Sequence, residues 1–238
     1  MRHESLSKDL KKPLVWIRQF PFTLITLGIL ILFTLITNTQ VDSLSRTWLN
    51  RLGFAPRDLI HMDWGRIITS ALVTYGGRAF WEALVLIALA VGLSEYLCGT
   101  FRAAGTYWGV HFTTLLIVTY LVAIPLHVFG LSIGSALIVA RDVGPSAAYF
   151  GCLGLVSARL NSPWRWIIGI LILGGLVAYP FLPSQVEQNA ILNLSANIAH
   201  LIAYPLGWIS SFIWKCRMNK APYKPPNGQT RTSWPHFE

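Results

Sequence analysis

Apolar residues along this chain gather into long blocks separated by short polar stretches. Six blocks are each close to the ~20 residues that an α-helix needs to cross the hydrocarbon core of a membrane. The pattern predicts an all-α, polytopic membrane protein with a six-transmembrane-helix bundle in residues 21–214. The fourth block is as short as the first, at 17 residues, and is richer in small residues. The blocks are 21–37, 80–99, 103–125, 144–160, 163–182 and 192–214.

The remaining segments are polar or mixed. Residues 1–20 and 215–238 are polar and basic, and we expect them to form cytoplasmic N- and C-terminal tails. A basic start followed by an apolar run is also typical of a secretory signal. The run at 21–37 is long for a signal and no small-x-small cleavage pattern follows it, so we predict a retained first helix. Residues 40–78 mix apolar side chains with arginines, which favours a loop in the membrane interface.

Composition and charge agree with a membrane protein. Hydrophobic residues make up 53% of the 238 residues and charged residues only 12%, whereas a soluble domain carries about 25% charged residues. The net charge of +9 does not indicate nucleic-acid binding, because most Lys and Arg flank the apolar blocks. With a cytoplasmic N-terminus, 13 of the 19 Lys and Arg fall on the cytoplasmic side, as the positive-inside rule favours. We expect an integral multi-pass protein of a bacterial inner membrane with both termini in the cytoplasm.

Ser146 is a candidate for chemistry because polar residues inside membrane spans are costly. It lies in Gly144-Pro145-Ser146, at the outer start of the fourth block. Pro145 suits the first turn of a helix, and Asp142 is placed to cap it. Free N–H groups and the positive end of the helix would favour an anion beside Ser146, such as the oxyanion of acyl transfer. The alternative interpretation is a small residue in a packed helix.

His200 is the second candidate, about two turns into the sixth block. It shares one helical face with small residues, and the fourth block carries a comparable face. Two such faces in contact would bring Ser146 and His200 within hydrogen-bond reach, the minimum for a serine activated by a base. The alternative is a histidine that only bonds to a neighbouring helix. The two faces are Ala196, His200, Ala203 and Gly207, and Ala147, Gly151 and Gly154.

At these residues the chain resembles a known family, the rhomboid intramembrane serine proteases. GPSAAYFGCLG at 144–154 resembles their G-x-S-G/A-x-x-x-G-x-x-G pattern, and ANIAH at 196–200, with Gly207 beyond, resembles their catalytic-histidine helix. WGRIIT at 64–69, with Trp64 and Arg66, is similar to the W-R-x-x-T stretch of their interfacial first loop. Glu95 and Gly99 match their E-x-x-x-G signature, and we expect Glu95 to pack against the first loop and accept from Arg66.

The resemblance implies a Ser–His dyad without an acid. Ser146 would be the nucleophile and His200 the general base, with Gly144, Pro145 and Asn197 supporting the oxyanion. The substrate would be a transmembrane segment of another membrane protein, cut near the outer surface. The lipid bilayer would be the other partner, with no cofactor, no metal and no nucleic acid.

The chain departs from the family at the oxyanion site. Rhomboid proteases usually carry a His and an Asn four residues apart at the start of the second span, and these positions are Ala79 and Ala83 here. Neither side chain can donate a hydrogen bond, and loss of one oxyanion donor costs ~10²–10³ in turnover. Phe150 stands where many members have a Tyr against the catalytic histidine. An inactive rhomboid-like protein that binds membrane-helix clients is therefore the alternative.

Other classes find less support. Six spans permit a small-solute transporter, but no duplicated half is visible and the polar residues do not line one path. The six histidines show no HExxH or other zinc spacing, which disfavours a metalloprotease. Neither a Walker loop nor GxGxxG occurs, which disfavours nucleotide binding.

Overall fold

The computed structural model describes residues 19–181 and 190–214, and within these ranges every named element is a helix. The all-α prediction is therefore confirmed for the described part of the chain. Two isolated backbone pairings, Ser43 with Gly76 and Phe54 with Asp142, join loops to one another. The predicted tails, 1–20 and 215–238, lie outside the described residues except for Gln19 and Phe20.

Helical segments occupy all six apolar blocks. Two of them, Arg78–Cys98 and Thr100–Val128, are long and apolar enough to cross a membrane by length and composition, whereas α2, α11 and α12 are shorter apolar helices. These two long helices support membrane association. The segments are α2 (Pro21–Thr37); α6 (Arg78–Leu86), η1 (Ile87–Val91) and α7 (Gly92–Cys98); α8 (Thr100–Ile117), η2 (Val118–Ala123) and α9 (Ile124–Val128); α11 (Ser146–Ala158); α12 (Trp164–Ala178) with η3 (Tyr179–Phe181); and α13 (Ala190–Trp214).

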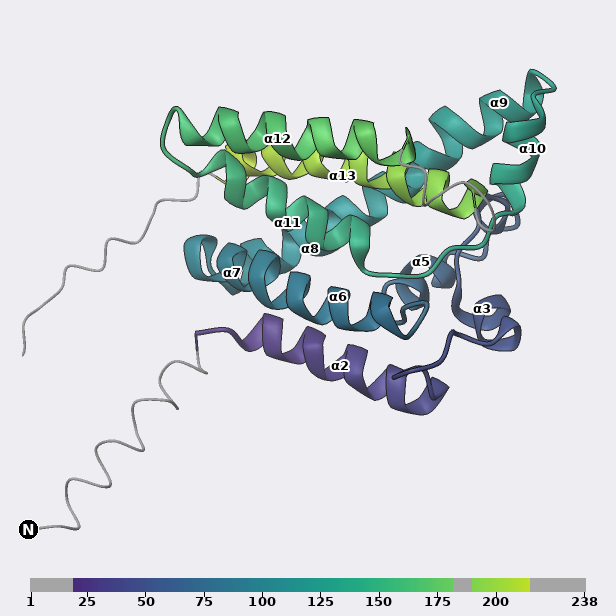
Figure 1. Cartoon of the computed structure of the whole chain (residues 1–238), viewed down its shortest axis with the longest axis horizontal. Helices are drawn as coiled ribbons and strands as arrows, with labels where there is room; N and C mark the ends of the chain where they lie inside the picture. Colours follow the sequence, from purple (N-terminus) through teal and green to yellow (C-terminus); the bar gives the residue numbers. More distant parts are fainter. Residues whose placement is uncertain (1–18, 182–189, 215–238) are drawn as a thin grey trace, which may run out of the picture.

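Successive segments run in alternating directions between two ends of the bundle (Figure 1). The start of α2, the turn between α7 and α8, and the turn between α11 and α12 lie at one end. Gly99 makes the α7–α8 turn with a φ of 84°, a conformation that glycine adopts without steric cost. The central helix is α11, which packs against α8, α13 and η1, and nine of its 13 residues are buried.

The opposite end of the bundle carries short helices (Figure 1). The predicted interfacial loop, 40–78, contains α3 (Arg46–Leu52), α4 (Pro56–Ile60) and α5 (Gly65–Ser70). A further helix, α10 (Ser132–Val139), folds back against α9 and was not predicted. Its eight residues are too few for a membrane span, and hydropathy alone does not separate such a helix from a loop. This end leads directly into the Ser146 helix.

Glu95 in α7 caps the start of α2 rather than pairing with the first loop. Its side chain is almost fully buried and accepts from Phe22 N at 3.0 Å, Thr23 N at 2.9 Å and Thr23 Oγ1 at 2.7 Å. No side chain of the preceding residue caps α2, so this carboxylate satisfies open N–H groups at the positive end of the helix. The expected bond from Arg66 to Glu95 is wrong, because Arg66 bonds to Asp63 and to loop carbonyls.

Replacement of Glu95 tests this contact between α7 and α2. We expect Glu95→Gln to lower the free energy of unfolding by about 1.5–3 kcal/mol, because it removes charge-assisted bonds to buried amides. Unfolding in mild detergent, followed by tryptophan fluorescence, measures the change. The matched control is Glu82→Gln, whose carboxylate bonds to the exposed Arg78 and should leave the transition unchanged. Equal effects of the two variants would contradict the capping role.

Candidate functional site: the start of α11 and its cavity

Ser146 is the first residue of α11, and Pro145 precedes it as the N-cap residue rather than lying within the first turn. Gly144 has a φ of 139° and its N–H donates to Ser70 O at 2.8 Å. The first main-chain bond of the helix runs from Tyr149 N to Pro145 O at 3.0 Å, and the N-cap residue, Pro145, provides no side-chain cap. The N–H groups of the first turn therefore have no acceptor within the helix.

Asp142 does not cap α11, contrary to expectation. Its Oδ1 accepts from Val143 N at 2.7 Å, so the carboxylate is bonded one residue along the chain and not to the helix. Its backbone pairs with Phe54, with N–O distances of 2.8 and 2.9 Å. Tyr75 Oη donates to Arg141 O at 3.0 Å. Residues 141–144 are thus tied to the 40–78 loop at several points, which sets the position of Ser146.

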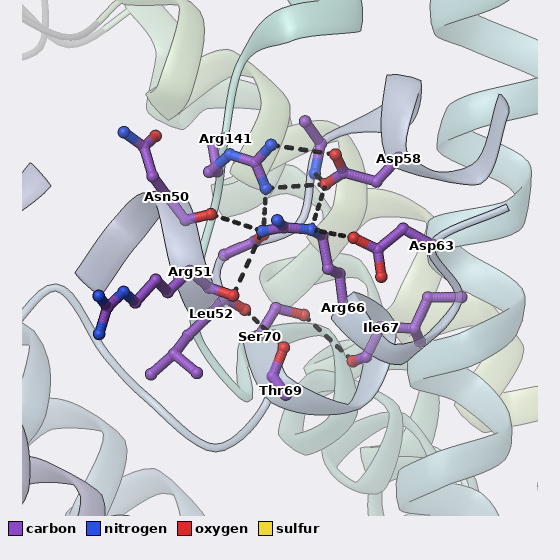
Figure 2. A network of polar contacts seen from close by, with 12 residues as sticks. Asn50, Arg51, Leu52, Asp58, Asp63, Arg66, Ile67, Thr69, Ser70 and Arg141 are labelled. Carbon is purple, nitrogen blue, oxygen red and sulfur yellow. Dashed lines mark hydrogen bonds and ion pairs between the residues drawn. The ribbon is translucent and has the colours of Figure 1, made fainter. Parts of the chain in front are cut away.

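A buried ion pair strengthens the same junction (Figure 2). Arg141 makes a two-pronged contact with Asp58, at 2.8 Å from Nη1 to Oδ2 and 3.0 Å from Nη2 to Oδ1. Asp58 Oδ2 also accepts from Ala55 N at 2.8 Å. Arg66 lies beside this pair and donates to Asn50 O at 2.6 Å. Planar guanidinium–carboxylate pairs of this kind fix geometry as well as adding energy.

Arg66 thus holds the 40–78 loop together through its bonds to Asp63 and to loop carbonyls. Trp64, which precedes α5, makes no comparable contact with the described residues and is 45% exposed. Thr69 in the same stretch donates to Leu52 O at 2.8 Å. The W-R-x-x-T stretch therefore contributes two side chains, Arg66 and Thr69, that bind α3 to α5.

Breaking the Asp58–Arg141 pair should disturb the Ser146 junction. We expect Asp58→Asn to cost about 3 kcal/mol of unfolding free energy, because it leaves a buried guanidinium without its counter-charge. The matched control is Asp63→Asn, since Asp63 contacts Arg66 with a half-exposed side chain. Detergent unfolding of both variants is the measurement. If Asp63→Asn destabilises the protein as much as Asp58→Asn, the role given to the buried pair is wrong.

Helices α11 and α13 meet backbone to backbone through the small residues predicted for helix packing. A methyl group on Gly207 would overlap the Gly151 carbonyl oxygen, and one on Gly154 would overlap the Tyr204 carbonyl oxygen. Ala203 is fully buried and packs in a cluster with Ala147 and Val110. The short side chains allow this approach, as they do in membrane helix pairs.

His200 lies on α13 with its ring stacked on Phe150 of α11, at 4.3 Å between ring centroids and 27° between planes. Its Nε2 is buried and has no hydrogen-bond partner among the described residues. Asn197 Oδ1, one turn earlier, is in the same state. Phe150 therefore keeps the stacking expected of an aromatic residue at this position, and two buried polar atoms remain unpaired.

Ser146 and His200 line neighbouring cavities. The Ser146 cavity, of about 170 Å³, is also lined by Tyr75, Ala79, Ala83 and Asp142. The His200 cavity, of about 430 Å³, is also lined by Phe150, Asn197 and Glu82. Tyr149, Asn193 and Ala196 border both cavities. No hydrogen bond joins Ser146 to His200 within the described ranges, so the dyad contact that the resemblance implies stays a prediction.

The polar groups of the Ser146 cavity, and the ion pair at the junction that leads to it, are the part that sequence reasoning missed. Tyr75, Asp58 and Arg141 are absent from the predicted site, and Asp142 is assigned another role there. Asp58 and Arg141 are 83 residues apart, a separation that no local spacing reveals. One feature of the sequence could have indicated Asp142: it is an acidic residue two positions before the Gly144-Pro145-Ser146 motif. Among the described residues, no group of three His, Cys, Asp or Glu side chains is placed to hold a metal ion.

Comparison of the chain with protein-family models, with curated proteins and with solved structures gives no match in any of the three.

Proposed function

We propose that this protein is a six-span intramembrane serine protease of the rhomboid type, which cleaves transmembrane segments of other membrane proteins near the outer surface. The observation that carries the proposal is the junction of α11 and α13. Ser146 is the first residue of α11, and α13 brings His200 against the same helix through direct glycine contacts. Ser146 and the half-buried His200 thus line two adjoining cavities, and we assign them the roles of nucleophile and base.

The surface of the bundle supports placement in a bilayer. Large apolar side chains are exposed along α2 and α12, where water would make contiguous apolar surface unfavourable. The alternating directions of the six segments place the start of α2 and the end of α13 at one end of the bundle (Figure 1). The exposed side chains include Leu24, Ile25, Ile31, Leu32, Leu35 and Ile36 on α2, and Trp164, Trp166, Ile167, Ile170 and Leu171 on α12.

The proposed mechanism uses only side chains and amides of this chain. Ser146 Oγ attacks the scissile carbonyl carbon while His200 Nε2 accepts its proton. The carbonyl oxygen becomes an oxyanion that the open N–H groups of the first turn of α11 stabilise. His200 then protonates the leaving amine, and a water molecule releases the acyl group by the reverse sequence. The step requires Ser146 and His200 to approach, and catalytic bonds that are open without substrate commonly close around it.

A second candidate function is capture of membrane helices without cleavage. It is favoured by Ala79 and Ala83, which line the Ser146 cavity and provide no side-chain donor for an oxyanion. In that case the exposed apolar faces of the bundle would bind the client, and Ser146 would have no chemical role.

The deciding experiment is cleavage of a single-span model substrate by the purified protein in liposomes. The proposal predicts cleavage by the parent chain and none by Ser146→Ala or His200→Ala. Cleavage that survives in either variant would contradict it. Retained client binding with no cleavage by any of the three chains would favour the second candidate.

A further inference from the structure

The cavity beside Ser146 contains a single charged side chain among the described residues that line it. That side chain is Asp142, and the other polar lining groups are neutral, with Tyr75 and Thr74 among them. Ala79 and Ala83 also line this cavity. Because both are alanines, they leave open space where longer side chains would fill it. The volume of about 170 Å³ is many times the ~10–15 Å³ that one water molecule needs.

Asp142 has no cation beside it in the described part of the chain. Arg141 turns away to Asp58 and to the Gly53 carbonyl, and Arg78 bonds to Glu82. The Asp142 carboxylate accepts from Val143 N, and the Tyr75 hydroxyl, which donates to Arg141 O, lies near it. Partly buried carboxylates are normally paired or bound to a cation. Asp142 therefore lacks the cation that usually pairs with a partly buried carboxylate.

The pKa values of Asp142 and Tyr75 agree with the absence of a cation beside the Asp142 carboxylate. Burial raises the pKa of the Asp142 carboxyl to about 6, although the hydrogen bond from Val143 N and the nearby Tyr75 hydroxyl act in the opposite direction. Burial and the nearby Asp142 charge raise the pKa of the Tyr75 hydroxyl well above its ordinary value. At neutral pH the cavity thus holds one under-stabilised negative charge beside a neutral phenol, and a positive charge placed there would stabilise it.

We propose that this cavity binds a cationic side chain, Lys or Arg, of the polypeptide segment that lies across Ser146, with Asp142 as its counter-charge. The assignment rests on the proposed function, which places a substrate backbone at Ser146. It adds a substrate class: membrane segments with a basic residue at their outer boundary. In this proposal Ala79 and Ala83 contribute to binding, because their small side chains leave space for the long side chain of Lys or Arg.

Binding tests the inference without requiring cleavage. The Ser146→Ala chain in detergent is titrated with labelled single-span peptides that carry Lys, Met or Glu at the outer boundary residue. Met matches the length of Lys without its charge. We expect the Lys peptide to bind about tenfold more tightly than the Met peptide at pH 7.5, and the Glu peptide most weakly. Added Asp142→Asn should bring the Lys-to-Met ratio near one, whereas Asp63→Asn, at the same end of the bundle, should preserve it.

If Asp142→Asn fails to fold, a second measurement is the Lys-to-Met binding ratio of the Ser146→Ala chain at a series of pH values. With a free pKa of about 6, most of the carboxyl is protonated at pH 5. Linkage then reduces the tenfold preference to about twofold. A Lys-to-Met ratio near one in the Ser146→Ala chain with Asp142 intact, at pH 7.5, would overturn the inference. So would a preference that survives both Asp142→Asn and pH 5.

The same peptides separate this inference from the proposed function. Ser146-dependent cleavage of the Met peptide tests the protease alone, because that peptide has no charge for Asp142. A Lys preference in binding with no cleavage of any peptide would reject the protease and leave the cation site standing. If the Lys and Met peptides are both cleaved and bind with equal affinity, the protease proposal stands and the cation site is rejected.

Discussion

Ser146→Ala and His200→Ala are each expected to lower the cleavage rate by about 10³-fold or more, to the uncatalysed background. In a serine nucleophile system the alcohol and its base act as a unit, so removal of either one eliminates most of the acceleration. The absence of side-chain donors at Ala79 and Ala83 lowers the parent rate by about two orders of magnitude in addition. The assay must therefore detect slow turnover, for example by gel separation of a labelled single-span substrate over hours.

Matched controls keep this result from being a trivial loss of fold. Ser157→Ala changes a serine of the same helix whose hydroxyl only bonds to Leu153 O at 2.7 Å. His127→Ala changes an exposed histidine that contacts Ser135. Both should retain the parent rate. Labelling of the parent chain by a fluorophosphonate probe, lost in Ser146→Ala and His200→Ala, would give independent support for an activated serine. Labelling that persists without Ser146 would refute the assignment.

Gly207→Ala is expected to give the largest loss of stability of any single methyl group, about 3 kcal/mol or more. The added carbon would overlap the Gly151 carbonyl oxygen, and a backbone atom in the middle of a helix cannot rotate away as a side chain can. Overpacking of a close contact usually costs 1–3 kcal/mol, and here the two helices must separate to relieve it. Separation would also pull His200 from its stack on Phe150, so activity should fall with stability.

The control is Gly174→Ala on α12, where an added methyl group meets nothing within 4 Å. Alanine is the better helix former by up to about 1 kcal/mol, so this variant should be as stable as the parent or slightly more stable. Denaturant unfolding in mild detergent distinguishes the two. If Gly207→Ala unfolds at the same midpoint as Gly174→Ala, then α11 and α13 do not make the close contact described above.

The hydropathy pattern was sufficient to locate the long helices. All six apolar blocks contain helices, and the predicted bounds of the first block, 21–37, are those of α2. The small-residue faces around Gly151 and Gly207 were also readable, because residues three and four apart share one side of a helix. The short helices could not be predicted in the same way. Helix α10 is apolar but too short to show a helical period, and the segment that contains α3, α4 and α5 was expected only as an interfacial loop.

Glu95 shows where local reasoning stops. Its importance was visible as a charged residue in an apolar block, but the partner assigned to it, Arg66, was wrong. A carboxylate binds whichever donors the fold brings near, and here these are the open amides at the start of α2. Arg66 is instead surrounded by carbonyl groups of its own loop.

By itself, then, the sequence determined that the long apolar segments form helices, that Ser146 lies in the first turn of one of them, and which helical faces are small enough for close contact. These properties depend on spacing along the chain, and the periods of helices and apolar runs are local. Only the tertiary structure decided that Asp58 pairs with Arg141, that Glu95 caps α2, and that Asp142 shares a cavity with Ser146. Such pairings depend on which surfaces meet when helices pack, and side chains separated by many residues leave no periodic trace of that meeting in the sequence.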